Sequence, residues 1–184
     1  AAQLAALTAT QIKGLTATDV SELTGTGMAA LAATQLAALT AGAIAGLSEE
    51  QIAALTTTQF KGLTASQVGS LSNAQLSALT DGHIGVLTTA AVLGLKPAQL
   101  AELTPAQLAG FSPKQLSALT ITQLKGLSAD QIGSLGTAQL GGLTATQLGG
   151  LTTSMIDGLS TTQLSSLTST QLKGLSGSAV SALS

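Results

Sequence analysis

The chain has 184 residues, of which 45% are hydrophobic and 8% charged, and its formal net charge is −2. Ordinary globular domains carry about 25% charged residues, and nucleic-acid-binding surfaces cluster Lys and Arg. Here the six cations are all Lys and are scattered, so we expect no nucleic-acid partner. The absence of cysteine excludes disulfides and thiolate metal sites. No apolar run approaches the roughly 18 residues of a membrane span, so we expect no membrane insertion.

Two apolar series run through the chain with a period of eight residues. One series consists of leucines from Leu7 to Leu183, with Phe111 as its exception, and the other runs from Leu4 to Val180. Together they define the consensus L-[ST]-x-x-Q-[LIV]-x-x, repeated 23 times over residues 1–184 as a single array. Because the first residues already follow this register, we interpret the chain as a segment of a longer repetitive protein.

The repeat at residues 7–14 shows the local structure that the consensus predicts. Thr8 and Gln11 have the spacing of a capping box, in which each side chain bonds the other residue's backbone N–H at a helix start. Leu7 and Ile12 occupy the two positions of a hydrophobic staple around that start. Ser or Thr fills the cap position in 20 of 23 repeats, and Gln fills the box position in 16. We therefore predict one capped helix of six or seven residues per repeat.

Rare residues further along the chain support this register independently. All three prolines, Pro97, Pro105 and Pro113, fall on the first helical position, where a missing N–H removes no helical hydrogen bond. Five of the eight acidic residues lie in predicted first turns, and four of the six lysines share one later position. Both biases match the helix dipole.

Such short helices require neighbours, because isolated helices need about 12–15 residues for stability. We predict an all-α solenoid, in which both apolar series face a common axis. The residue before each leucine is nearly always Gly, Ala or Ser, with Glu22, Val86 and Glu102 as exceptions, so successive coils can approach closely. Frequent Gly there also suggests helix breaks. A β-solenoid remains the alternative, since the many threonines favour strands.

Few residues suggest chemistry, and each has a structural interpretation. The Glu49–Glu50 pair falls in a first turn, where it matches the helix dipole. His83, the only histidine, has only Asp81 beside it and replaces the box Gln, which indicates capping and no metal site. Gly141–Gly142 and Gly149–Gly150 lack the residues of a phosphate-binding motif, and we interpret them as packing positions. We therefore predict no catalytic, cofactor-binding or metal-binding residues, no cofactor and no enzyme activity.

The run LTATQLGGLTTSMIDGLSTTQLSSLTSTQLKGL resembles the octapeptide arrays of very large bacterial surface proteins. These proteins are often labelled adhesin-like or "heme utilization or adhesion" proteins, and their arrays repeat the pattern LTTAQ[IV]AAL. The resemblance covers the whole chain. It implies an extracellular stalk, filament or spacer on a bacterial cell surface.

Three functions follow from these observations. The first is a structural element, a stalk or a self-assembling filament, because the surface is regular and neither end carries a polar capping repeat, which favours end-to-end or lateral self-association. The second is a binding module for a peptide or glycan, although the Tyr, Trp and Arg anchors of such surfaces are absent. The third is ice binding by the regularly spaced threonines.

Overall fold

The structure, a computed structural model, describes residues 2–182, in which short helices alternate with turns and extended residues. It contains 23 short α-helices, one per repeat, and no strand among the described residues. The predicted all-α fold is therefore confirmed, and the β-solenoid alternative is wrong. Ala1 and Leu183, which the repeat register includes, lie outside the described residues.

The helices divide between two compact units, Ala1–Leu95 and Lys96–Ser184. The N-terminal unit contains α1 (Ala2–Ala5), α2 (Ala9–Lys13), α3 (Ala17–Ser21), α4 (Gly25–Ala29), α5 (Ala33–Ala38), α6 (Ala41–Ala45), α7 (Glu49–Ala53), α8 (Thr57–Phe60), α9 (Ala65–Ser70), α10 (Asn73–Ser77), α11 (Asp81–Gly85) and α12 (Thr89–Val92). The C-terminal unit contains α13 (Pro97–Ala101), α14 (Pro105–Ala109), α15 (Pro113–Ala118), α16 (Ile121–Leu124), α17 (Ala129–Gly133), α18 (Thr137–Gly142), α19 (Ala145–Gly149), α20 (Thr153–Asp157), α21 (Thr161–Ser165), α22 (Ser169–Gly174) and α23 (Gly177–Ala182).

Each helix from α2 to α22 begins directly after its predicted cap position. Thr8 is extended, with φ −72° and ψ 160°, its hydroxyl accepts the Gln11 backbone N–H, and the Gln11 side chain accepts the Thr8 N–H. The three prolines stand at helix starts as predicted. The helices are only four to six residues long, shorter than predicted. The reason is that the chain becomes extended around each leucine and cap, as at Leu39 with ψ 146°, so that it can turn into the next repeat.

The glycines before the leucines do not end the helices in the way the sequence suggested. Glycine commonly ends a helix because it adopts a left-handed conformation. No described residue, glycine or other, has a positive φ, and Gly14 has φ −77° and ψ −11°. A Cβ on Gly46, Gly62 or Gly126 would instead come within 3 Å of another coil, so the role of these glycines is close packing. A Cβ on Gly14 would meet only the Gln11 carbonyl oxygen of its own helix.

The two apolar series form a continuous core inside each unit. Residues of the second series are buried from Ile12 to Ile156, and those of the leucine series from Leu31 to Leu167. Phe60 and Phe111 both occupy core positions, as predicted. Burying a side chain of this size contributes about 1.5–3 kcal/mol, so the core is the main source of stability for helices that are too short to persist alone.

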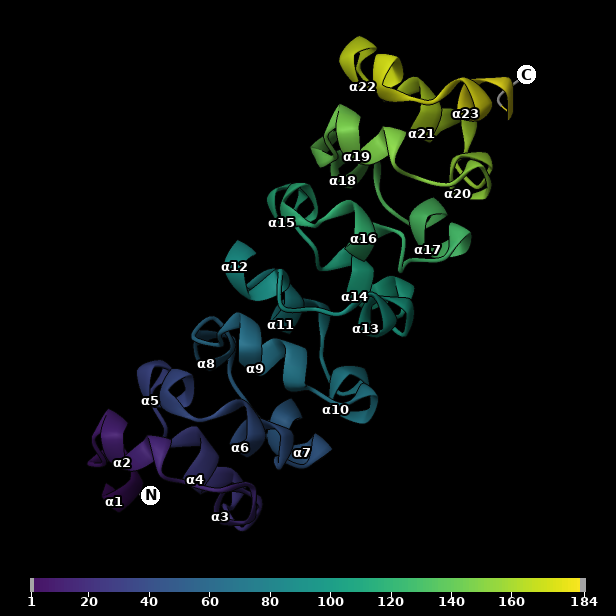
Figure 1. Ribbon diagram of the computed structural model, residues 1–184. Helices are drawn as coiled ribbons and strands as arrows, with labels where there is room; N and C mark the ends of the chain where they lie inside the picture. The colour runs from purple at the N-terminus through teal and green to yellow at the C-terminus, as the bar shows by residue number, and fades with distance from the viewer. Residues whose placement is uncertain (1, 183–184) are drawn as a thin grey trace. The chain divides into compact units, whose positions relative to one another are not determined.

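Successive coils of the solenoid pack helix on helix with a spacing of three repeats. In the N-terminal unit α5 packs against α8 and α6 against α9, and in the C-terminal unit α15 packs against α18 and α19 against α22 (Figure 1). The C-terminal end of the later helix meets the start of the earlier one. A Cβ placed on Gly62 would lie 2.6 Å from the Ala33 carbonyl oxygen, for example. The small residue before each leucine therefore permits this contact, as predicted.

Three pairs of glycines, spaced 25 residues apart, meet between neighbouring coils: Gly69 and Gly94, Gly133 and Gly158, and Gly149 and Gly174. In each pair a Cβ on the first glycine would approach the carbonyl oxygen of the second. A Cβ on the second would in turn approach the first residue of the helix three repeats earlier. The backbones of neighbouring coils thus touch directly at these positions.

None of the helices within residues 2–182 has the length and apolar character that crossing a membrane requires.

Candidate functional site

The box glutamine makes hydrogen bonds both within its own repeat and to another coil. In Gln67 the Oε1 atom accepts the backbone N–H of Thr64 at 2.8 Å. The Nε2 atom donates to the carbonyl oxygens of Leu36 and Leu39, both at 2.8 Å. The side chain is 1% exposed, so these bonds lie out of water. One amide therefore caps its own helix and also holds the end of a helix four repeats earlier.

The same arrangement recurs along both units, and we call the set of these buried side chains the glutamine ladder. In each member Oε1 accepts the cap N–H, and Nε2 donates to carbonyl oxygens 28 to 31 residues earlier. Its members include Gln35, Gln51, Gln59, Gln67 and Gln75 in the N-terminal unit and Gln131, Gln139, Gln147, Gln163 and Gln171 in the C-terminal unit.

The ladder and the helix contacts together fix the size of a coil. Each helix packs on the start of the helix three repeats earlier, while its glutamine bonds to the end of the helix four repeats earlier. These two partners follow each other directly in the chain. One turn of the solenoid within each unit therefore contains between three and four repeats, a number that the sequence left open.

The sequence predicted that the box glutamine caps its own helix, but not that it also bonds to another coil. A capping box is satisfied by Glu as well as Gln, whereas the box position in this chain is Gln in 16 repeats and Glu in none. Only an amide can donate to carbonyl oxygens while its own oxygen accepts the cap N–H. The frequent use of Gln and the absence of Glu at this position were therefore the signal for a second partner.

The ladder is interrupted where the box residue has no amide. Ala43, Ala91, Met155 and Ala179 are buried at ladder positions but carry no donor there. Gln11 and Asp19 are exposed, and their side-chain hydrogen bonds stay within their own repeats. Coupling between coils is therefore uneven along the chain.

His83 replaces the glutamine at one ladder position, as its place in the repeat indicated. Its Nδ1 atom lies 3.3 Å from the Thr80 backbone N, and its Nε2 atom lies 2.9 Å from the Leu55 carbonyl oxygen. The ring stacks on Phe60, with 4.5 Å between ring centroids. Among the described residues no group of three His, Asp or Glu side chains gathers as a metal site would require.

The other residues that the sequence analysis considered are two glutamates and four glycines, and none of them belongs to the ladder. Glu49 and Glu50 lie exposed in the first turn of α7, as predicted, and hydrogen bonds from the Glu50 backbone and the Ser48 hydroxyl lower the pKa of Glu50. Gly142, Gly149 and Gly150 each lie against a neighbouring coil, which confirms them as packing positions. The same interpretation of Gly141 is wrong, because a Cβ there would meet nothing within 4 Å.

Acid is expected to loosen α3 through Asp19. The Thr16 backbone N–H donates to Asp19 Oδ2 at 2.8 Å and the Thr16 hydroxyl at 2.7 Å, and these bonds, the backbone one foremost, lower the pKa of Asp19. A lowered pKa means that the carboxylate stabilises the folded state above the unfolded value of about 3.9, and that this stabilisation is lost as the pH falls through the folded value. Amide exchange of α3 should therefore accelerate in acid relative to α2. In Asp19→Asn this pH dependence should disappear, and an unchanged profile would contradict the assignment.

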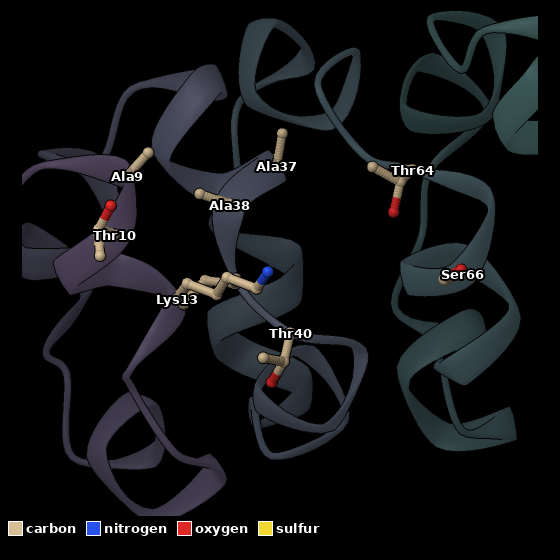
Figure 2. A pocket seen from close by; sticks show the side chains of 9 residues that line it. Ala9, Thr10, Lys13, Ala37, Ala38, Thr40, Thr64 and Ser66 are labelled. Atoms are coloured by element: carbon tan, nitrogen blue, oxygen red, sulfur yellow. The ribbon is translucent and has the colours of Figure 1, made fainter.

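A shallow groove lies on the surface of the N-terminal unit. It has a volume of about 710 Å³ and is lined by Ala9, Thr10, Lys13, Ala37, Ala38, Leu39, Thr40, Thr64 and Ser66. In Figure 2 the Lys13 side chain extends from α2 toward Thr40, with Thr64 and Ser66 on the opposite side. The groove offers hydroxyls and one ammonium group, which suit polar ligands.

Comparison with known proteins identifies the type of repeat in two stretches. Residues 28–65 and 121–153 match the model of the ALTTAQ repeat family. One ALTTAQ stretch lies in each unit, and together they cover less than half of the chain. No curated protein matches the chain.

The ALTTAQ stretches contain the structural elements described above. Residues 54–59 read ALTTTQ, so the named motif begins before a core leucine and ends on a ladder glutamine, Gln59. The motif thus contains the small packing residue, the core leucine, the cap residue and the glutamine that bonds to another coil. The match supports a repeat array in which the residues of the motif stabilise the coil.

Proposed function

We propose that this protein is a structural repeat array that serves as an extracellular stalk or a self-assembling filament on a bacterial cell surface, with no enzyme activity. The observation that carries the proposal is the glutamine ladder. The core leucines, the caps and the box residues take part in holding the coil together, and the same bonds recur from repeat to repeat. Such a chain provides length and regularity, which are the properties that a stalk or filament needs.

The regular coil supports self-association, because the same contacts recur from one coil to the next. Leu172 and Val180 belong to the apolar core series but are 42% and 52% exposed. Such an exposed apolar edge can be covered by a further coil of the same kind, supplied either by more repeats of the same chain or by a second copy.

Electron microscopy of the purified chain tests the proposal. We expect rods or fibres whose length grows with protein concentration, and only compact monomers would contradict the filament. Leu172→Lys introduces a charge at the exposed edge and should shorten end-to-end assemblies while leaving lateral ones intact. Leu93→Lys introduces the same charge at a leucine that is 48% exposed in the middle of the chain, and it is the matched control. Immunolabelling of intact cells of the source organism tests the surface location separately.

A second candidate function is a binding module for a glycan or a peptide, and the groove around Lys13 favours it. The hydroxyls of Thr10 and Ser66 and the Lys13 ammonium could recognise a polar ligand there. A glycan array and a peptide pull-down, each repeated with Lys13→Ala, would detect this activity. The ice-binding alternative receives less support, because cap hydroxyls such as those of Thr56 and Thr64 already bond to box glutamines. A thermal hysteresis assay tests it.

A further inference from the structure

His83 is the only titratable side chain in a ladder position that is also buried. It is 6% exposed and bridges two coils, as the ladder glutamines do. A backbone N–H can only donate and a backbone carbonyl can only accept. Nδ1 must therefore be unprotonated to accept the Thr80 N–H, and Nε2 must carry the hydrogen that it donates to the Leu55 carbonyl. The geometry thus requires one neutral tautomer of the ring.

Protonation is incompatible with this arrangement. It would place a second hydrogen on Nδ1, 3.3 Å from the Thr80 nitrogen, so two donors would face each other. The new charge would lie in a buried position with no acceptor for the Nδ1 hydrogen, which is unfavourable. The Phe60 ring attracts a cation through its face, but it offers no oxygen or nitrogen that could accept this hydrogen.

The charged residues around His83 do not provide that acceptor. On the elements that meet the ring in this unit they are Glu49 and Glu50 of α7, Lys61 after α8, and Asp81 of α11, all of them exposed. Asp81 Oδ1 accepts the Gly82 backbone N–H at 2.8 Å. Both hydrogen bonds of the His83 ring involve backbone groups, so a carboxylate does not balance the charge of an imidazolium there.

We propose that His83 makes the joint between α11 and the coil at Leu55–Phe60 sensitive to acid, so that protonation opens this one place in the array. The ladder glutamines carry no titratable proton, so their joints persist over the same pH range. The sign follows from linkage: a proton that binds the open state better than the closed one destabilises the closed state as the pH falls. The joint should therefore hold at neutral pH and weaken as the pH falls. This inference does not depend on the stalk or filament function.

Amide hydrogen exchange on the full chain tests the joint. Protection factors, corrected for the intrinsic effect of pH, should fall about tenfold for α11 between about pH 7.5 and pH 5, while those of α9 stay nearly constant. In His83→Gln, which restores the ladder residue, α11 should behave like α9. Equal responses of wild type and His83→Gln would overturn the proposal, because acid would then act elsewhere.

Nuclear magnetic resonance of the single imidazole gives a second readout that does not depend on a variant. At neutral pH the ring nitrogens should show hydrogen on Nε2 and none on Nδ1. During acidification the ring signal should change together with the α11 amide signals. An imidazolium that forms while α11 keeps its protection, or a neutral ring with hydrogen on Nδ1, would overturn the proposal.

Discussion

Replacing Gln67 with alanine is expected to lower the free energy of unfolding by about 3 kcal/mol. The substitution removes the donor to the Leu36 and Leu39 carbonyl oxygens and the acceptor for the Thr64 N–H. Each buried polar group left without its partner costs about 1–3 kcal/mol. Leu36 O also accepts the Leu39 N–H at 3.2 Å and so keeps one partner. The loss of stability should therefore stay well below the sum of three such costs. Urea unfolding followed by circular dichroism measures the change.

Gln11→Ala is the matched control for Gln67→Ala. Gln11 makes the same capping bonds, with Oε1 2.9 Å from the Thr8 nitrogen, but it is exposed and does not bridge coils in this structure. Loss of the cap contribution alone should cost about 1 kcal/mol or less. The difference between the two variants measures the bond between coils. Equal losses would show that the ladder adds nothing to the capping box.

Gln67→Glu tests the bond between coils with a side chain of nearly identical shape. Its carboxylate could still accept the Thr64 N–H but would face two carbonyl oxygens, and a buried, unpaired charge is strongly unfavourable. We expect Gln67→Glu to be less stable than Gln67→Ala at neutral pH and to recover part of the difference in acid, where a protonated carboxyl can donate. A Glu variant as stable as the wild type would contradict the bridging role.

Gly94→Ala is expected to destabilise the array by about 1–3 kcal/mol, the usual effect of overpacking. A Cβ on Gly94 would collide with the Ala65 carbonyl, which is backbone and cannot rotate away as a side chain would. The contact between α9 and α12 would have to widen. Urea unfolding and amide exchange of these two helices should both report the loss.

Two glycines provide controls for Gly94→Ala. A Cβ on Gly25 or on Gly141 would meet nothing within 4 Å. Gly25→Ala should change stability by less than about 0.5 kcal/mol. Gly141→Ala, inside α18, should stabilise the protein by about 0.5–1 kcal/mol, because alanine loses less backbone freedom in a helix. If all three variants behaved alike, helix propensity and not contact between coils would explain the glycines.

The repeat, the helix starts and the core residues could be predicted from the amino-acid sequence alone. These features are local or periodic: Thr8 and Gln11 are three residues apart, the prolines occupy first helical positions, and the apolar series recur every eight residues. Hydrogen bonds and steric constraints between residues a few positions apart produce these features. The pattern could therefore be interpreted without knowing which coils contact each other. His83 was assigned to the cap for the same reason.

The contacts between coils, in contrast, depend on the folded arrangement of the helices and could not be predicted. The partners of Gln67 are 28 and 31 residues away, and the partner of Gly94 is 29 residues away. A period of eight residues is compatible with any number of repeats per turn, so it cannot tell which carbonyl meets which amide. That choice depends on how three to four short helices close a coil around the leucines. The same packing places the buried His83 between the Thr80 N–H and the Leu55 carbonyl oxygen. At this position we propose that protonation of the ring breaks the bond between the coils.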